Sequence, residues 1–163
     1  MPSDAFPLGL ADDGVAWNVA WFRPARGNLA VVGQRGRGVR TLLANIERYA
    51  RGHDLPVRVV ADADELLDPL ATSGEAARLR RDLADPSRCT VFALRSGRRL
   101  RVPEHCATRV VFPTGERTVD LADGVPADLL RSLGADGART PGRAVLVDGA
   151  SATLLQCAAP PGP

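Results

Sequence analysis

The sequence contains no lysine, so all 21 of its basic residues are arginines. With 19 acidic residues, the formal net charge is only +2 over 163 residues. A protein that binds DNA or RNA without sequence preference usually presents a broad basic surface. The charge balance therefore argues against nucleic acid as a partner, including a role as an accessory to a DNA translocase. Any site for an anion must be local.

Cysteine and histidine are also scarce. The three cysteines, Cys89, Cys106 and Cys157, include no C-x-x-C pair, so they indicate neither a disulfide framework nor a zinc site. His53 and His105 have no spaced partner, and we expect no metal site. This cysteine usage is typical of proteins in a reducing cytosol.

Long apolar runs are absent. No stretch reaches the roughly 18 apolar residues that a membrane-spanning helix needs. The first residues, MPSDAFP, lack the basic and apolar regions of a signal peptide. We expect a cytoplasmic protein without direct membrane insertion, held at the cytoplasmic face of a membrane only through a partner or a longer parent chain.

Short apolar runs alternate with segments of helical spacing. The length suits one domain, which we place at residues 1–158, followed by a flexible tail at 159–163. Helices are predicted at 41–50, 75–83 and 127–133. Strands are predicted at 15–22, 29–32, 57–61, 89–94, 108–112, 144–147 and 152–157. This order predicts an α/β fold with a mostly parallel sheet flanked by helices, closed by a C-terminal β-hairpin.

A glycine-rich loop joins the predicted strand 29–32 to the predicted helix 41–50. Gly33 and Gly38 have the spacing of the phosphate loop G-x-x-x-x-G-K-[ST]. In that loop, backbone N–H groups surround the phosphates, the lysine contacts the β and γ oxygens, and the hydroxyl holds magnesium. Val39 and Arg40 stand at the lysine and hydroxyl positions. The spacing predicts either a phosphate loop that has lost its main charge or a solvated strand-to-helix turn that binds nothing.

Four motifs, in this order, resemble an FtsK/SpoIIIE-type ATPase domain. They are FPLGLADD at 6–13, the Gly33 to Gly38 loop, VVADADEL at 59–66 and PGRA at 141–144. Together they are most similar to the tandem domains of the EccC motor of actinobacterial type VII (ESX) secretion, over nearly the whole chain. The resemblance implies a P-loop NTPase-like (RecA-like) fold. It also implies protein partners, either neighbouring ATPase domains or a small helical export substrate, and leaves a homo-oligomer open.

The chain departs from this family in three places. Val39 cannot supply the positive charge that clamps the transferred phosphoryl group. In a family-like V-V-D-D-x-D-E-L, the first aspartate helps to hold magnesium and the second position polarises water; Ala61 falls at the first and Asp62 at the second. Only residues 52–56 separate the predicted helix 41–50 from the next predicted strand. Similar domains usually carry a further strand and helix at this place, so we expect a fold of reduced size.

These departures predict a catalytically degenerate domain, because positioning and charge stabilisation are nearly all the catalysis that phosphoryl transfer requires. Asp62 is then the single catalytic candidate. The candidates for a phosphate site are Gly33, Gly36, Gly38, Arg40 and Thr41. No cofactor is assigned, and ATP with Mg²⁺ stays open. The alternative is an ATP-binding and hydrolysing motor domain in which a shifted Arg40-Thr41 replaces Lys-Thr.

Arginines also gather after two of the predicted strands, at Arg35, Arg37, Arg40, Arg95, Arg98, Arg99 and Arg101. Since the carboxyl ends of parallel strands meet at one edge of a sheet, these seven arginines could line one rim. The rim could receive phosphate, an acidic peptide or carboxylates of a neighbouring domain. It could equally be a solvated face, or pair with Asp62, Asp64 and Glu65 in an ion-pair network.

Overall fold

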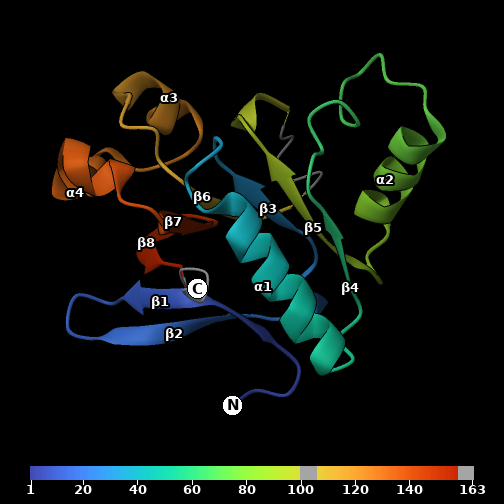
Figure 1. The fold of residues 1–163 in the computed structure, drawn as a ribbon, viewed down its shortest axis with the longest axis horizontal. Helices are drawn as coiled ribbons and strands as arrows, with labels where there is room; N and C mark the ends of the chain where they lie inside the picture. Colours follow the sequence, from blue (N-terminus) through green and yellow to red (C-terminus); the bar gives the residue numbers. More distant parts are fainter. Residues whose placement is uncertain (100–105, 158–163) are drawn as a thin grey trace.

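The computed structural model describes residues 1–99 and 106–157, which form one sheet with helices on both faces (Figure 1). The strands are β1 (Phe6–Asp12), β2 (Trp17–Phe22), β3 (Leu29–Val32), β4 (Val57–Val60), β5 (Cys89–Leu94), β6 (Thr108–Val111), β7 (Arg143–Asp148) and β8 (Ser151–Gln156). The α-helices are α1 (Val39–Gly52), α2 (Gly74–Ala84), α3 (Arg117–Ala122) and α4 (Ala127–Arg139), and the short 3-10 helices are η1 (Pro24–Arg26) and η2 (Gly97–Arg99). The predicted tail at 159–163 lies outside the described residues.

The sheet is mixed, with the strand order β2-β1-β8-β7-β6-β3-β5-β4. Strands β4, β5, β3 and β6 are parallel neighbours, whereas the pairs from β6 through β7, β8 and β1 to β2 are antiparallel. The prediction of a mostly parallel sheet is therefore wrong. Two hairpins, β1–β2 and β7–β8, supply the antiparallel half, because strands joined by a tight turn must run in opposite directions. The predicted closing hairpin is confirmed.

Most elements lie where the sequence patterns place them, but two were not predicted. These are the first strand, β1, and the short helix α3. Helix α4 is longer than the predicted 127–133 segment, and it continues past a kink at Gly134, whose φ is 65°. Helix α1 connects directly to β4 through residues 53–56, as the short spacing predicts. Within the described residues, no helix is both long enough and apolar enough to cross a membrane.

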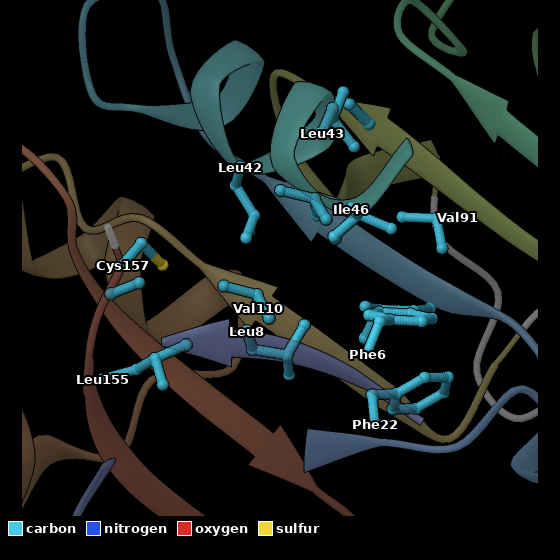
Figure 2. Close-up of a cluster of buried hydrophobic side chains, with 14 of the residues drawn as sticks. Phe6, Leu8, Phe22, Leu42, Leu43, Ile46, Val91, Val110, Leu155 and Cys157 are labelled. Atoms are coloured by element: carbon cyan, nitrogen blue, oxygen red, sulfur yellow. The ribbon is translucent and has the colours of Figure 1, made fainter. Parts of the chain in front are cut away.

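The core lies on both faces of the central strand β3. Leu29 and Val31 pack on one face with Ile46 of α1, and Figure 2 shows Leu42, Leu43 and Ile46 of this helix above Phe6, Leu8 and Val110 of the sheet. On the opposite face, Ala30 packs with residues of α2, and Val32 packs in a cluster that side chains of α4 cover. A strand buried on both faces reads as a continuous apolar run. This burial fixes the direction in which the chain enters the glycine loop at Gly33.

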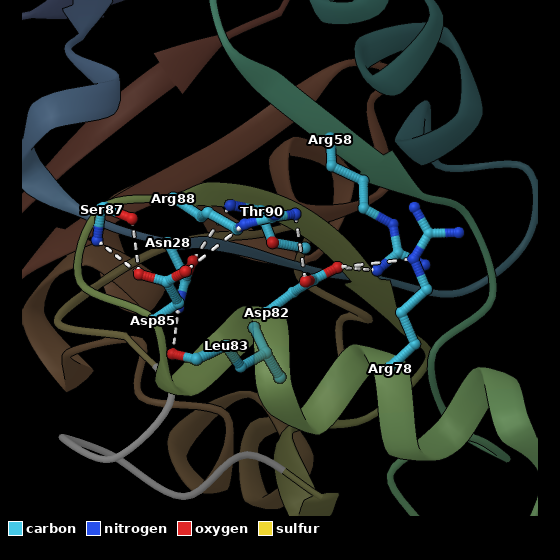
Figure 3. Close-up of polar contacts among 9 residues, drawn as sticks. All are labelled: Asn28, Arg58, Arg78, Asp82, Leu83, Asp85, Ser87, Arg88 and Thr90. Atoms are coloured by element: carbon cyan, nitrogen blue, oxygen red, sulfur yellow. Dashed lines mark hydrogen bonds and ion pairs between the residues drawn. The ribbon is translucent and has the colours of Figure 1, made fainter.

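A buried carboxylate fastens α2 to the sheet (Figure 3). The carboxylate of Asp82 pairs with Arg58 of β4, accepts a hydrogen bond from Arg88 Nη1 at 3.3 Å, and lies 4.0 Å from Arg78 Nε. Beside it, Asn28 Nδ2 donates to Leu83 O at 2.9 Å. Charge-assisted hydrogen bonds of this kind are stronger than neutral ones. The cluster lies at the amino end of β5, away from the glycine loop.

Candidate functional site

A cavity of about 460 Å³ opens at the carboxyl ends of β3, β4 and β5. Its lining consists of Gly33, Gln34, Arg35, Gly36, Gly38, Val39, Arg40, Thr41, Ala61, Asp62, Asp64, Ala93, Leu94, Arg95, Pro141 and Gly142. In open α/β sheets, ligands bind outside the carboxyl ends of parallel strands. Every candidate residue of the phosphate site, together with Asp62, reaches this one cavity. Their role in binding stays a prediction.

The glycine loop leads from the end of β3 into the N-terminus of α1. Gly33 N–H donates to Leu94 O at 2.9 Å, which anchors the loop to β5. Gly36 has a φ of 80° and Gly38 a φ of 113°, a region that side chains disfavour. Gly38 precedes α1, and no side chain caps this helix. The first N–H groups of α1 therefore lack intrahelical acceptors and carry the positive end of its dipole.

Val39, at the position of the missing lysine, lines the cavity with an uncharged side chain. Its side chain is partly buried against the hydrophobic cluster that contains Leu42 and Ile46 of α1. A β-carbon placed on Gly33 would lie 2.7 Å from Val39 Cγ2 and 2.9 Å from Phe112 Cβ, so the isopropyl group and the ring close over this glycine. Ala61, at the first acidic position, lines the cavity without a carboxylate. The lysine position and the first acidic position of the family pattern are thus occupied by uncharged side chains that line the cavity.

Three of the seven rim arginines line the cavity, namely Arg35, Arg40 and Arg95. Arg37 turns away and donates to Thr114 O at 3.3 Å. Arg98 is not among the lining residues; the side chain of Arg99 and all of Arg101 lie outside the described part of the chain. The rim is therefore narrower in the described residues than the sequence suggested.

The described residues do not form the ion-pair network that the sequence left open as one alternative. Across residues 1–99 and 106–157, Asp62, Asp64 and Glu65 make no ion pair with an arginine side chain. The carboxylate of Asp64 instead accepts a hydrogen bond from the main-chain N–H of Arg95, at 3.1 and 3.2 Å from its two oxygens. Asp62 is exposed in the cavity. The same described residues contain no cluster of three or more side chains suited to a metal ion.

A second carboxylate fixes the segment that carries Arg95. Gly97 N–H donates to Asp123 Oδ1 at 2.9 Å. Burial raises the pKa of the Asp123 carboxyl, and the hydrogen bond from Gly97 lowers it in part. Because the folded pKa lies above the ordinary value, the contribution of Asp123 to stability falls as the pH rises from the ordinary value through the raised one. Asp64 and Asp123 thus hold the two ends of the segment 95–97.

Pro141 and Gly142 line the cavity although they were not among the predicted site residues. Gly142 N–H donates to Arg37 O at 3.0 Å, so the segment that precedes β7 contacts the glycine loop directly. The sequence signal was the PGRA segment at 141–144, which had contributed only to the family resemblance.

Comparison with known proteins adds evidence from structure rather than from sequence. No model of a known protein family and no curated protein sequence matches this chain. EssC (ATPases 2 and 3) from Geobacillus thermodenitrificans is similar with a TM-score of 0.60 and 14% identity, covering 94% of this chain and 44% of that one. The coupling protein TcpA of the pCW3 conjugation system, solved with ATPγS, is similar with a TM-score of 0.64 and 7% identity, covering 96% of this chain and 66% of that one. EccC (ATPases 2 and 3) from Thermomonospora curvata, in complex with a signal sequence peptide, is similar with a TM-score of 0.55 and 14% identity, covering 98% of this chain and 41% of that one.

The chain shares its fold with a part of each of these three structures. It spans between 41% and 66% of the length of these three structures. The likeness therefore concerns one part of larger proteins. With identities of 7–14%, the likeness establishes the fold alone and leaves activity, substrates and partners to be inferred from this chain's own residues.

Proposed function

We propose that residues 1–158 form a catalytically degenerate FtsK/SpoIIIE-like domain that acts through protein interaction or regulation in type VII protein secretion, in the cytoplasm. The observation that carries the proposal is the packing of Val39 against Gly33 at the lysine position. Ala61 at the magnesium position supports it. Without both groups, the loop cannot neutralise the charge that develops during phosphoryl transfer.

The cavity remains suited to a negatively charged group. Arg35, Arg40 and Arg95 line it, and in the described residues none of them forms an ion pair with an acidic side chain. Unpaired arginines favour carboxylate or phosphate, which they bind through two parallel hydrogen bonds. EccC from Thermomonospora curvata is a type VII secretion ATPase, and part of it has been solved in complex with a signal sequence peptide; this similarity supports a protein partner. A neighbouring ATPase domain or a small helical export substrate fits this chemistry.

The proposal predicts that the domain changes the ATP turnover of an active ATPase domain from the same secretion system, or captures one of its helical export substrates. Replacing both Arg35 and Arg95 with alanine should weaken the effect by about tenfold, since two charge-assisted contacts are removed. Arg48→Ala is the matched control, because Arg48 is exposed on α1 and contacts only Asn45 among the described residues. An unchanged turnover at saturating domain, together with no capture of any substrate, would contradict the proposal.

One observation favours a second candidate function, ATP hydrolysis through a shifted loop. Arg40, Thr41 and Asp62 all line the same cavity. In this account Arg40 replaces the lysine and Asp62 replaces the lost aspartate. The planar guanidinium is a poor substitute for the compact charge of lysine, which is why we rank this function second. Magnesium-dependent turnover that Arg40→Ala and Asp62→Ala both abolish would establish it.

A further inference from the structure

The motifs at residues 6–13, 33–38 and 141–144 meet at the end of β8. Gly142 N–H donates to Arg37 O in the glycine loop at 3.0 Å, and Gly142 O accepts a hydrogen bond from Cys157 N–H at 2.8 Å. One peptide segment therefore connects the loop to the residue that follows β8. Gln156 Nε2 adds hydrogen bonds to Pro141 O at 3.3 Å and Cys157 O at 3.2 Å.

Glycines make this close approach possible. A β-carbon on Gly38 would lie 3.3 Å from Gly142 N and 3.4 Å from Gly142 Cα. One on Gly142 would lie 2.8 Å from Gln156 Nε2 and 2.9 Å from Cys157 O. One on Gly9 of β1 would lie 2.4 Å from Gln156 O and 2.9 Å from Cys157 Cα. A β-carbon on Gly9 or Gly142 would overlap backbone atoms, and one on Gly38 would require the Gly142 backbone to shift by a few tenths of an ångström.

Positive backbone angles alone do not explain these contacts. Gly36 in the loop has a φ of 80°, and Gly149 in the β7–β8 turn has a φ of 60°. A β-carbon on either would meet nothing within 4 Å. Gly36 and Gly149 need glycine for their angles only, whereas Gly38 and Gly142 also need it for their neighbours.

We propose that Gly9, Gly38 and Gly142, together with the backbone of Gln156 and Cys157, form a glycine junction that positions the phosphate loop and couples the cavity to the end of β8. The inference rests on the proposed function only in taking this cavity as the site. Coupling between two sites is reciprocal, so if a change at the loop loosens Cys157, a change at the end of β8 loosens the loop in turn. Such coupling gives an occupant of the cavity a route to the end of β8.

The test is amide hydrogen exchange in paired glycine variants, which requires no ligand. Gly38→Ala should speed exchange of the Gly142 and Cys157 amides by about tenfold, because the new methyl group displaces the Gly142 backbone. Gly36→Ala also places a side chain at a positive φ, but its β-carbon meets no neighbouring atom. It should leave the exchange rates of both amides within about twofold of those of the wild type. Unchanged exchange at Cys157 in Gly38→Ala, or equal acceleration in Gly36→Ala, would overturn the proposal.

The reverse direction uses the end of β8. Gly142→Ala should speed exchange of the amides of residues 34–38 by about tenfold, whereas Gly149→Ala should not. If Gly142→Ala does not fold, as judged by circular dichroism, Gln156→Ala removes two hydrogen bonds without adding atoms and should speed the same loop amides by about threefold. A loop that exchanges at the wild-type rate in the folded variant contradicts the coupling. ATP turnover by this chain would refute the proposed function and leave these exchange results standing.

Discussion

Replacing Phe112 with alanine is expected to lower the free energy of unfolding by about 3–5 kcal/mol, the usual cost of emptying a buried aromatic site. The ring is 1% exposed and lies against both ends of the glycine loop. Its Cδ2 would be 3.3 Å from a β-carbon on Gly33, and its Cε1 3.4 Å from one on Gly38. The substitution should therefore also speed amide exchange in the loop. Urea denaturation and hydrogen exchange measure the two effects.

The matched control for Phe112→Ala is Phe6→Ala. Phe6 is fully buried in the same hydrophobic cluster, but its ring packs at a tilt against the ring of Phe22, with centroids 5.4 Å apart, away from the loop. We expect a similar loss of stability, measured under the same conditions, and little selective change in the loop. Equal acceleration of loop exchange in the two variants would show that Phe112 is ordinary core and gives the loop no particular support.

Replacing Asp82 with alanine is expected to lower the free energy of unfolding by about 2–3 kcal/mol. The loss leaves Arg58, whose side chain is only 29% exposed, without its carboxylate. Removing one partner of a fully buried ion pair costs more than this. Here Arg78 and Arg88 are mostly exposed, and water can replace the carboxylate as their hydrogen-bond partner, so we expect a smaller loss of stability. Chemical denaturation checks the value.

Asp85→Ala is the control for the Asp82 prediction, because Asp85 also pairs with Arg88, at 3.4 Å, but in an exposed position. Surface pairs of this kind contribute about 1 kcal/mol or less. Asp82→Asn should fall between the two alanine variants, since the amide keeps the shape and one acceptor. If Asp82→Ala costs no more than Asp85→Ala, the cluster does not fasten α2 to the sheet.

The buried strands were the easiest elements to predict from the sequence. β3 and β5 lie at the predicted residues 29–32 and 89–94, because strands covered on both faces are continuous apolar runs. β1 was missed since Pro7 and Gly9 interrupt its pattern, and its pairing with β2 is irregular between these two residues. Whether neighbouring strands are parallel or antiparallel depends on which strands pair in the sheet. The local sequence therefore could not predict the mixed sheet.

The sequence was sufficient to predict which loops of the main chain form the candidate site. Loops that follow parallel strands meet at one edge, which is why the glycine loop and Asp62 share a cavity. The direction of the side chains was not predictable, because distant partners decide it. Arg37 bonds to Thr114, 77 residues away, and Asp64 bonds to the main chain of Arg95. Neither partner has a signal in the local sequence.

We propose that the loop does not serve magnesium-dependent ATP chemistry. The decisive measurement is calorimetric titration of the purified chain with ATP and ADP, with magnesium and with a chelator, with Arg40→Ala measured alongside. We expect no magnesium-dependent binding, because Val39 and Ala61 stand in place of the two groups that hold the complex. Binding that requires magnesium and disappears in Arg40→Ala would refute the proposed degeneracy and establish the shifted loop.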